Sequence, residues 1–143
     1  YEGLSGDTYP DRMPGGIPGV YEVQGLPVTP YMVPQDCGMH MQTKWLEIVR
    51  KTSLDNTDRG GRSSRLKITA EEGKDFAFSC LPYTAQELEN AMHHEELPPA
   101  RRTVVSILGA VRGVGGINSW GADVEDIYHI SGEQDISYGF WIE

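Results

Sequence analysis

The stretch RLKITAEEGKDFAFSCL, residues 65–81, holds two β-rich segments on either side of a turn-like tetrapeptide. The segments are 65–70 and 75–81, and EEGK between them has the glycine and polar composition of a tight turn. The pattern predicts a β-hairpin over 65–81. Within it, the apolar run FAFSC predicts that Cys80 is a buried small hydrophobic residue.

Further strands are predicted on both sides of this hairpin. They cover residues 20–24, 43–51, 103–111 and 135–142. Segment 43–51 alternates, but Leu46 and Ile48 point to one face and Trp45 and Val49 to the other, which indicates burial on both faces. The breaker-rich stretch LDNTDRGGR, residues 54–62, predicts a turn cluster.

One short helix is predicted near 84–94. Thr84 followed three residues later by Glu87 forms a capping box, and residues 85–94 carry an apolar stripe of Leu88, Ala91 and Met92. About five or six strands with one helix predict an all-β fold, a two-layer antiparallel β-sandwich. The length of 143 residues suits a single domain, residues 1–143.

Residues 1–30 are rich in glycine and proline but also carry apolar side chains that disordered tails usually lack. They predict an ordered arm laid over a surface. The expected anchors, counting the residue just after the arm, are Tyr1, Tyr9, Ile17, Val20, Tyr21, Val23, Leu26 and Tyr31.

Composition narrows the class of protein. A net charge of −9 repels phosphate backbones and argues against a nucleic-acid partner, and no run reaches the ~20 apolar residues of a membrane span.

Two cysteines are not a disulfide framework, although a Cys37–Cys80 bridge stays open. Reduced thiols and no signal-peptide pattern favour the cytoplasm. Because Tyr1 stands where a Met would, we expect a fragment of a longer protein.

Polar clusters give no catalytic or metal site. The adjacent His93 and His94 point about 100° apart on a helix, so they make a poor metal site. No serine has a nucleophile-elbow context. The acidic pairs have the character of solvated faces; they are Glu71–Glu72, Glu95–Glu96 and Glu125–Asp126. We therefore predict no catalytic residue and no metal ligand in this chain.

The loop GVGGINSWG, residues 113–121, combines four glycines with one tryptophan. Its glycines permit positive φ and close backbone approach, and Asn118 and Ser119 can turn the backbone through side-chain bonds. The residues alone support two interpretations equally. Trp120 either folds into the core, as most tryptophans do, or forms an aromatic platform for a sugar.

Several stretches together resemble one family. They are YPDR (9–12), PYMVPQDCG (30–38), KWLEI (44–48), PYTAQELENAMH (82–93) and GVGGINSWG. The sequence resembles the C-terminal domain of bacterial β-galactosidases of glycoside hydrolase family 2, which in some lactic acid bacteria is a separate small subunit. The resemblance implies a large sandwich (supersandwich) similar to galactose mutarotases, of which this chain would be about the C-terminal half. Half a sandwich would expose sheet edges or an apolar face, so the fragment carries a risk of self-association.

The resemblance also implies roles. The catalytic glutamates, with the Mg²⁺ and Na⁺ sites, would lie on a TIM-barrel domain or large subunit, and Trp120 would contact the aglycone of a β-galactoside such as lactose. Asn118 and Ser119 would be substrate-binding neighbours, although the family often has acidic residues where Ile117 and Asn118 stand. Arg12 and Asp36 are expected in ion pairs or an interface.

Two alternatives remain. A free-standing carbohydrate-binding domain would use the same tryptophan, and a mutarotase-type enzyme would need a His–Glu pair. No convincing pair of that kind is found in the sequence.

Overall fold

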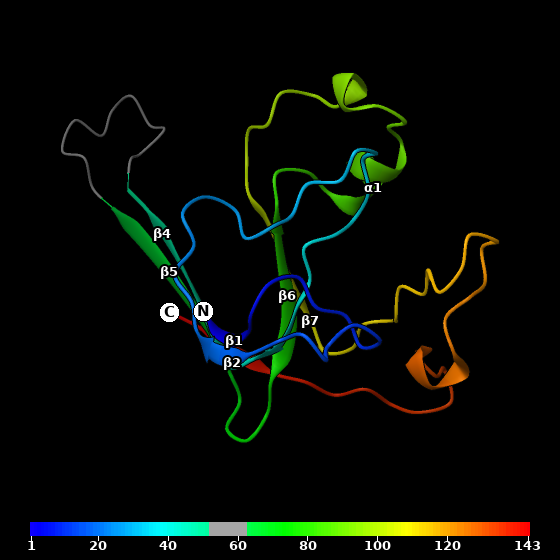
Figure 1. The fold of residues 1–143 in the computed structure, drawn as a ribbon. Coiled ribbons are helices and arrows are strands. Elements are labelled where there is room, and N and C mark those ends of the chain that lie inside the picture. Colours follow the sequence, from blue (N-terminus) through cyan, green and yellow to red (C-terminus); the bar gives the residue numbers. More distant parts are fainter. Residues whose placement is uncertain (52–62) are drawn as a thin grey trace.

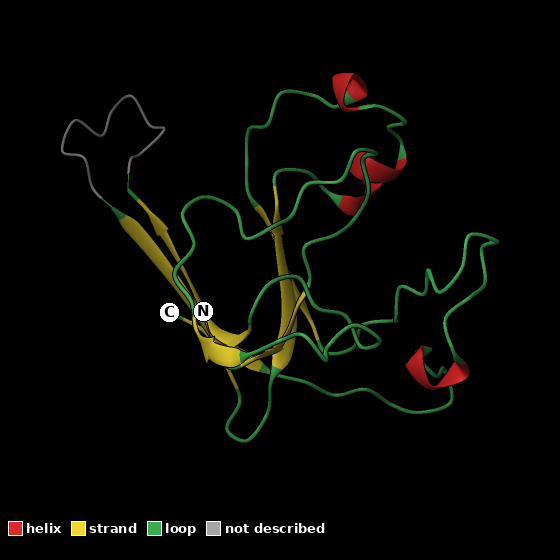
Figure 2. Cartoon of the chain, viewed as in Figure 1, coloured by secondary structure: helices red, strands yellow, loops and turns green. Residues whose placement is uncertain are grey.

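Two antiparallel sheets form the fold in this computed structural model, which describes residues 1–51 and 63–143 (Figures 1 and 2). The first sheet has the order β2-β1-β4-β5-β8 and the second the order β3-β6-β7. The strands are β1 (Glu2–Leu4), β2 (Pro18–Val20), β3 (His40–Thr43), β4 (Trp45–Arg50), β5 (Ser64–Ala70), β6 (Phe76–Leu81), β7 (Val104–Leu108) and β8 (Phe140–Ile142). The predicted all-β class is confirmed, whereas the turn cluster predicted at 54–62 lies outside the described residues.

The predicted hairpin over 65–81 is wrong, because its two strands belong to different sheets. β4 pairs with β5, with Trp45 opposite Thr69, and β3 pairs with β6, with His40 opposite Phe78. The four strands are thus one long hairpin that bends at a corner. Residues 71–75 connect β5 to β6 at that corner.

At this corner the strand predicted at 43–51 is divided into two strands. Lys44 separates β3 from β4, and its carbonyl still accepts a hydrogen bond from the amide of Ala70 at 2.8 Å. Gln42 has a φ of 54° within the register shift between His40 and Thr43. Such a bulge increases local bend and twist, which lets one chain serve two sheets.

The core lies around β6, whose six residues are all buried. Phe78 is 0% exposed and contacts the rings of Tyr1 and His40 at centroid distances of 5.2 and 4.8 Å. Cys80 is buried as predicted, and Cys37 is buried in a separate cluster with Leu81 and Leu88. Both thiols are free, so the structure contains no Cys37–Cys80 bridge.

The N-terminal arm is ordered, but it is part of a sheet rather than a cover over one. β1 lies between β2 and β4, and strand pairing at β2 stops at Val20 instead of covering 20–24. Tyr1 is buried, and Tyr21 and Leu26 pack against the core. Four expected anchors are instead exposed; they are Ile17, Val20, Val23 and Tyr31. Val20 lies on β2, the edge strand of its sheet, and the other three lie outside the strands.

The predicted capping box is present, but the helix is short. The hydroxyl of Thr84 accepts from the amide of Glu87, whose carboxylate accepts from the amide of Thr84. α1 covers only Ala85–Glu89, because the amide of Met92 donates to the side chain of Glu96 rather than continuing the helix. Leu88 and Ala91 are buried as predicted, whereas Met92 is 74% exposed.

Two short 3₁₀ turns complete the structure, η1 (His94–Glu96) and η2 (Asp126–Tyr128). β7 and β8 are shorter than the predicted 103–111 and 135–142, and β8 pairs with β5 through Ile142 opposite Ile68. In the described part of the chain, no helix is long and apolar enough to cross a bilayer.

Candidate functional site

Between β7 and β8 the chain leaves the sheets and projects outward as a long segment, yellow to orange in Figure 1. The loop 113–121 lies in this segment and is closed at its base. Arg112 forms an ion pair with Asp123, and the amide of Gly113 donates to the carbonyl of Tyr128 at 3.0 Å. Val124 is 6% exposed and anchors the returning chain. The loop therefore has two ends held close together, as in compact surface loops.

The glycines allow this backbone path. Gly115, Gly116 and Gly121 have φ values of 69°, 73° and 74°, which confirms the positive φ expected from the sequence. Gly113 is needed for space instead, because a Cβ there would lie 2.6 Å from Cγ2 of Val124 and 2.8 Å from Cβ of Tyr128.

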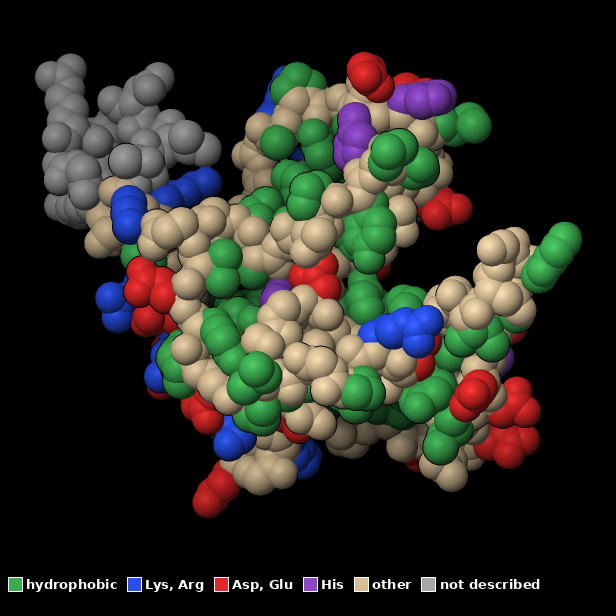
Figure 3. Space-filling view, viewed as in Figure 1, with side chains coloured by type: hydrophobic (Ala, Val, Ile, Leu, Met, Phe, Trp, Pro, Cys, Tyr) green, Lys and Arg blue, Asp and Glu red, His purple; other side chains and the backbone are tan. Residues whose placement is uncertain are grey.

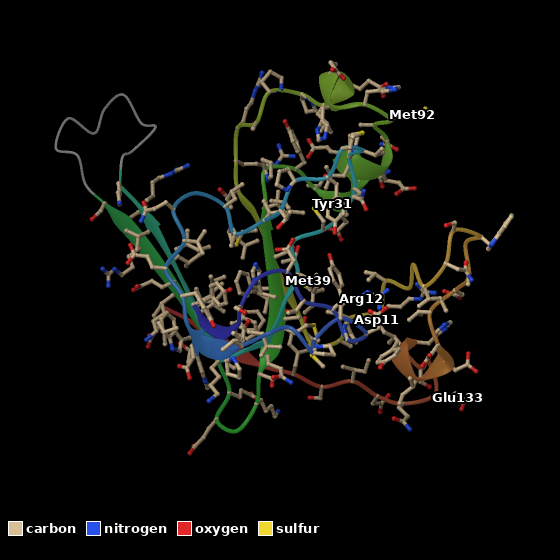
Figure 4. The ribbon with its side chains drawn as sticks, in the orientation of Figure 1. Asp11, Arg12, Tyr31, Met39, Met92 and Glu133 are labelled. Atoms are coloured by element: carbon tan, nitrogen blue, oxygen red, sulfur yellow. The ribbon has the colours of Figure 1, made fainter. Side chains whose placement is uncertain are left out.

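Asp11 and Arg12, from the turn between β1 and β2, hold the beginning of the loop (Figure 4). The carboxylate of Asp11 accepts hydrogen bonds from the amides of Val114 at 3.0 Å and Gly115 at 2.8 Å. Arg12 donates to the carbonyl of Gly115, so this residue is bound through both its backbone groups. Burial alone would raise the pKa of Asp11, but the two amides and the Arg12 guanidinium hold that pKa below its usual value.

Trp120 lies outside the core, with 92% of its surface exposed. The interpretation that it folds back into the core is therefore wrong for this structure. Hydrophobic side chains occur along the projecting segment in Figure 3, and the exposed ones there include Val114, Ile117, Trp120, Ile127 and Ile130.

Asn118 and Ser119 lie beside the indole and have different parts in the loop. The side-chain oxygen of Asn118 accepts from the amides of Trp120 at 2.9 Å and Ala122 at 3.4 Å, so it shapes the turn under the tryptophan. Ser119 is exposed. The structure thus brings Asn118, Ser119 and Trp120 together on one exposed turn.

The other polar candidates are dispersed over the surface. Glu71 pairs with Lys74 at 2.6 Å, and Glu96 pairs with His93 at 2.9 Å. Asp36 is exposed, and the ion pairs of the described residues do not include it. Among residues 1–51 and 63–143, no group of three or more His, Cys, Asp or Glu side chains could hold a metal ion.

A groove of about 710 Å³ lies on another part of the surface, and residues 113–121 are not among its lining residues. Its walls come from β4 and residues 20–27, with Arg65, Cys80 and Thr103. Trp120 is not among its lining residues, so this groove and the tryptophan loop are separate features of the surface.

Asp11 is the site residue that sequence reasoning did not single out. It stands inside the quoted motif YPDR, but 104 residues separate it from Gly115, so no local pattern connects them. Within this motif the sequence singles out the neighbouring Arg12 for an ion pair or an interface. Arg12 lies 3.9 Å from Asp11 and also bonds the loop.

Comparison with known proteins gives the family. The family model "Beta galactosidase small chain" matches residues 1–142. The chain is 61% identical over 142 residues to the β-galactosidase small subunit of Latilactobacillus sakei, covering 99% of this chain and 44% of that protein. It is 37% identical to β-galactosidase BgaC of Bifidobacterium adolescentis and 34% identical to the β-galactosidase of Streptococcus thermophilus. These alignments cover 92% and 96% of this chain but only 12% of either relative.

The chain thus spans less than half of the small subunit it matches and a small part of the larger enzymes. That it forms the C-terminal half of a sandwich domain stays a prediction. The family model matches residues 1–142, and one relative is 61% identical over 142 residues of this chain. The chain therefore belongs to the family of β-galactosidase small chains.

Proposed function

We propose that the chain is a non-catalytic part of a β-galactosidase that completes the active site of a catalytic domain or large subunit. The two carboxylates of the retaining reaction would lie on that partner, together with its Mg²⁺ and Na⁺. The chain would contribute Trp120 to binding of the aglycone of a β-galactoside. On its own it would hydrolyse nothing.

One observation carries this proposal. The indole of Trp120 is exposed on a loop whose base is hydrogen-bonded to Asp11 in the body of the protein. Exposure of 92% leaves the face of Trp120 free for the apolar C–H face of a pyranose. Such stacking is worth about 1–1.5 kcal/mol on the scale of aromatic contacts. Asn118, whose oxygen is already used inside the loop, has its side-chain NH₂ to offer to a sugar hydroxyl.

The test is a Trp120→Ala variant in the complete enzyme, assembled with its catalytic partner. We expect weaker binding of lactose and of glucose as acceptor, by about tenfold for a loss near 1.4 kcal/mol. Trp141→Ala is the matched control, because Trp141 is also exposed, at 66%, but lies on β8. Unchanged binding of glucose-type acceptors in Trp120→Ala would overturn the role of the indole.

The need for a catalytic partner is tested separately from the role of Trp120. Hydrolysis of a galactoside should be absent with the chain alone and appear when the catalytic partner is added. Galactoside binding by the chain alone would favour the free-standing carbohydrate-binding domain, and mutarotation by it would favour the autonomous enzyme. Size-exclusion chromatography of the chain alone tests the proposed self-association through the outer strands of the sheets.

We place the assembly in the cytoplasm, without nucleic acid or membrane as partner. The support is the pair of free thiols, Cys37 and Cys80, which a reducing compartment preserves, and the acidic charge. Measuring where the natural protein fractionates in its cells tests this location.

A further inference from the structure

The turn that carries Asp11 is itself well held. The amide of Arg12 donates to the carbonyl of Tyr9 at 2.8 Å, which closes a turn between β1 and β2. The side chain of Asp11 is only 5% exposed, whereas that of Arg12 is 45% exposed. Asp11 therefore presents a shielded carboxylate from a strand connection of the first sheet.

This carboxylate meets the loop with both oxygens. Oδ1 accepts from the amide of Val114 and Oδ2 from the amide of Gly115. Hydrogen bonds to an ionised acceptor are roughly twice as strong as neutral ones, and two together fix direction as well as distance. The guanidinium of Arg12 lies 3.9 Å from Oδ2 of Asp11 and bonds the carbonyl of Gly115, so the pair binds one peptide segment from two sides.

The tip of the loop has fewer attachments than its base. The hydrogen bonds at Trp120 and Ala122 go to Asn118, within the loop itself. The position of the indole relative to the sheets therefore depends on the base. At that base, the Arg112–Asp123 pair is exposed, with side chains 47% and 64% accessible, whereas the carboxylate of Asp11 is shielded. Exposed ion pairs contribute little, so Asp11 is the stronger attachment.

We infer that Asp11 is a positioning residue: with Arg12, it holds the base of the loop so that Trp120 is presented in a fixed place to the aglycone of the substrate. This rests on the proposed function of Trp120. Asp11 touches no substrate and acts through the loop.

The experiment uses the complete enzyme with Asp11→Asn, Trp120→Ala and the double variant. Asp11→Asn keeps the size of the side chain, but it removes the charge and leaves only one oxygen for two amides. We expect KM for lactose to rise by up to about tenfold, the effect expected from removing the indole itself, with kcat within about twofold. In the Trp120→Ala background the same substitution should change KM by less than about twofold, because coupled residues are not additive.

Amide hydrogen exchange of Val114 and Gly115 gives a readout that does not involve activity. We expect faster exchange at both amides in Asp11→Asn. Asp7→Asn is the matched control, since Asp7 also accepts a backbone amide, from Thr29 at 3.2 Å, but lies outside the loop. It should leave exchange at the loop and KM unchanged. If Asp11→Asn fails to fold, Arg12→Ala removes a half-exposed side chain and is expected to raise KM in the same direction.

The outcomes separate the two proposals. A raised KM in Trp120→Ala without one in Asp11→Asn overturns the positioning role and leaves the proposed function standing. An equal rise in KM from Asp11→Asn with and without the indole also overturns the positioning role. If Trp120→Ala changes nothing, the proposed function fails, and unaltered amide exchange in Asp11→Asn would then remove the attachment as well.

Discussion

Asp11 accepts a hydrogen bond from the backbone amide of Gly115 at 2.8 Å, although 104 residues of chain separate the two. This contact joins a turn of the first sheet to the base of the loop that carries Trp120. It explains how a glycine-rich segment can present an exposed indole from a defined position.

The Asp11 contact should depend on pH. Because the pKa of Asp11 is lowered from its ordinary 3.8, its stabilisation is fully present above that value and is lost as pH falls from 3.8 through the folded-state pKa. The charged group facing it is the Arg12 guanidinium, 3.9 Å away. The amide chemical shifts of Val114 and Gly115 should titrate together with a midpoint below 3.8. In Asp11→Asn this titration should vanish, and a midpoint above 3.8 would contradict the assignment.

Gly113→Ala should destabilise the base of the loop. The added Cβ would overlap Val124 and Tyr128, and such overpacking costs about 1–3 kcal/mol. Denaturant unfolding, with amide exchange at Val124 as a local measure, checks the loss. Gly132→Ala is the control in the same segment, because nothing lies within 4 Å of its added Cβ. Equal effects of the two substitutions would show that space at Gly113 is not limiting.

Thr84→Ala should remove the N-terminal cap of α1. The Thr84 hydroxyl accepts the amide of Glu87 at 3.2 Å, and loss of such a cap costs about 1 kcal/mol of unfolding free energy. Thr84→Ser keeps the hydroxyl and should retain most of the stability. A Ser variant as unstable as the Ala variant would mean that the methyl group, rather than the cap, matters.

Cys80 should resist alkylation in the folded protein. Burial raises the pKa of its thiol to about 11, so almost no thiolate is present at pH 8. Burial, and to a smaller extent the negative charges of Asp7 and Asp36, also raise the pKa of Cys37. Cys37 is nevertheless the more accessible thiol, with 9% of its surface exposed against 3% for Cys80. Iodoacetamide labelling read by mass spectrometry should modify Cys37 first. Both should react after denaturation, and faster labelling of Cys80 in the folded state would contradict the packing of β6.

Local sequence signals predicted much of the structure. The Thr84–Glu87 capping box lies within one turn of chain, and the positive φ of Gly115 and Gly116 follows from glycine itself. The buried run around Cys80 shows its apolar character directly. These features could be predicted from neighbouring residues alone, because each depends on backbone conformation or burial along a single segment.

Strand pairing was decided by the tertiary structure. Segments 65–70 and 75–81 have the pattern of a hairpin, yet β5 pairs with β4 and β6 pairs with β3. A turn signal shows where the chain bends but not which partner completes the hydrogen bonds of each strand. Here β5 and β6 do not pair with each other. Their partners are β4 and β3, the two strands on either side of Lys44.

The sequence by itself determined the family, the β-rich class and the presence of a glycine-rich loop with one tryptophan. The residues of the loop left the burial of Trp120 open, the family resemblance favoured an exposed indole, and the fold places that indole in solvent. Burial of a side chain depends on what the rest of the chain brings beside it, and here the distant Asp11 and Arg12 bind the base of the loop and leave its tip in solvent. Such long-range contacts carry no local periodicity, which is why the structure was needed to find them.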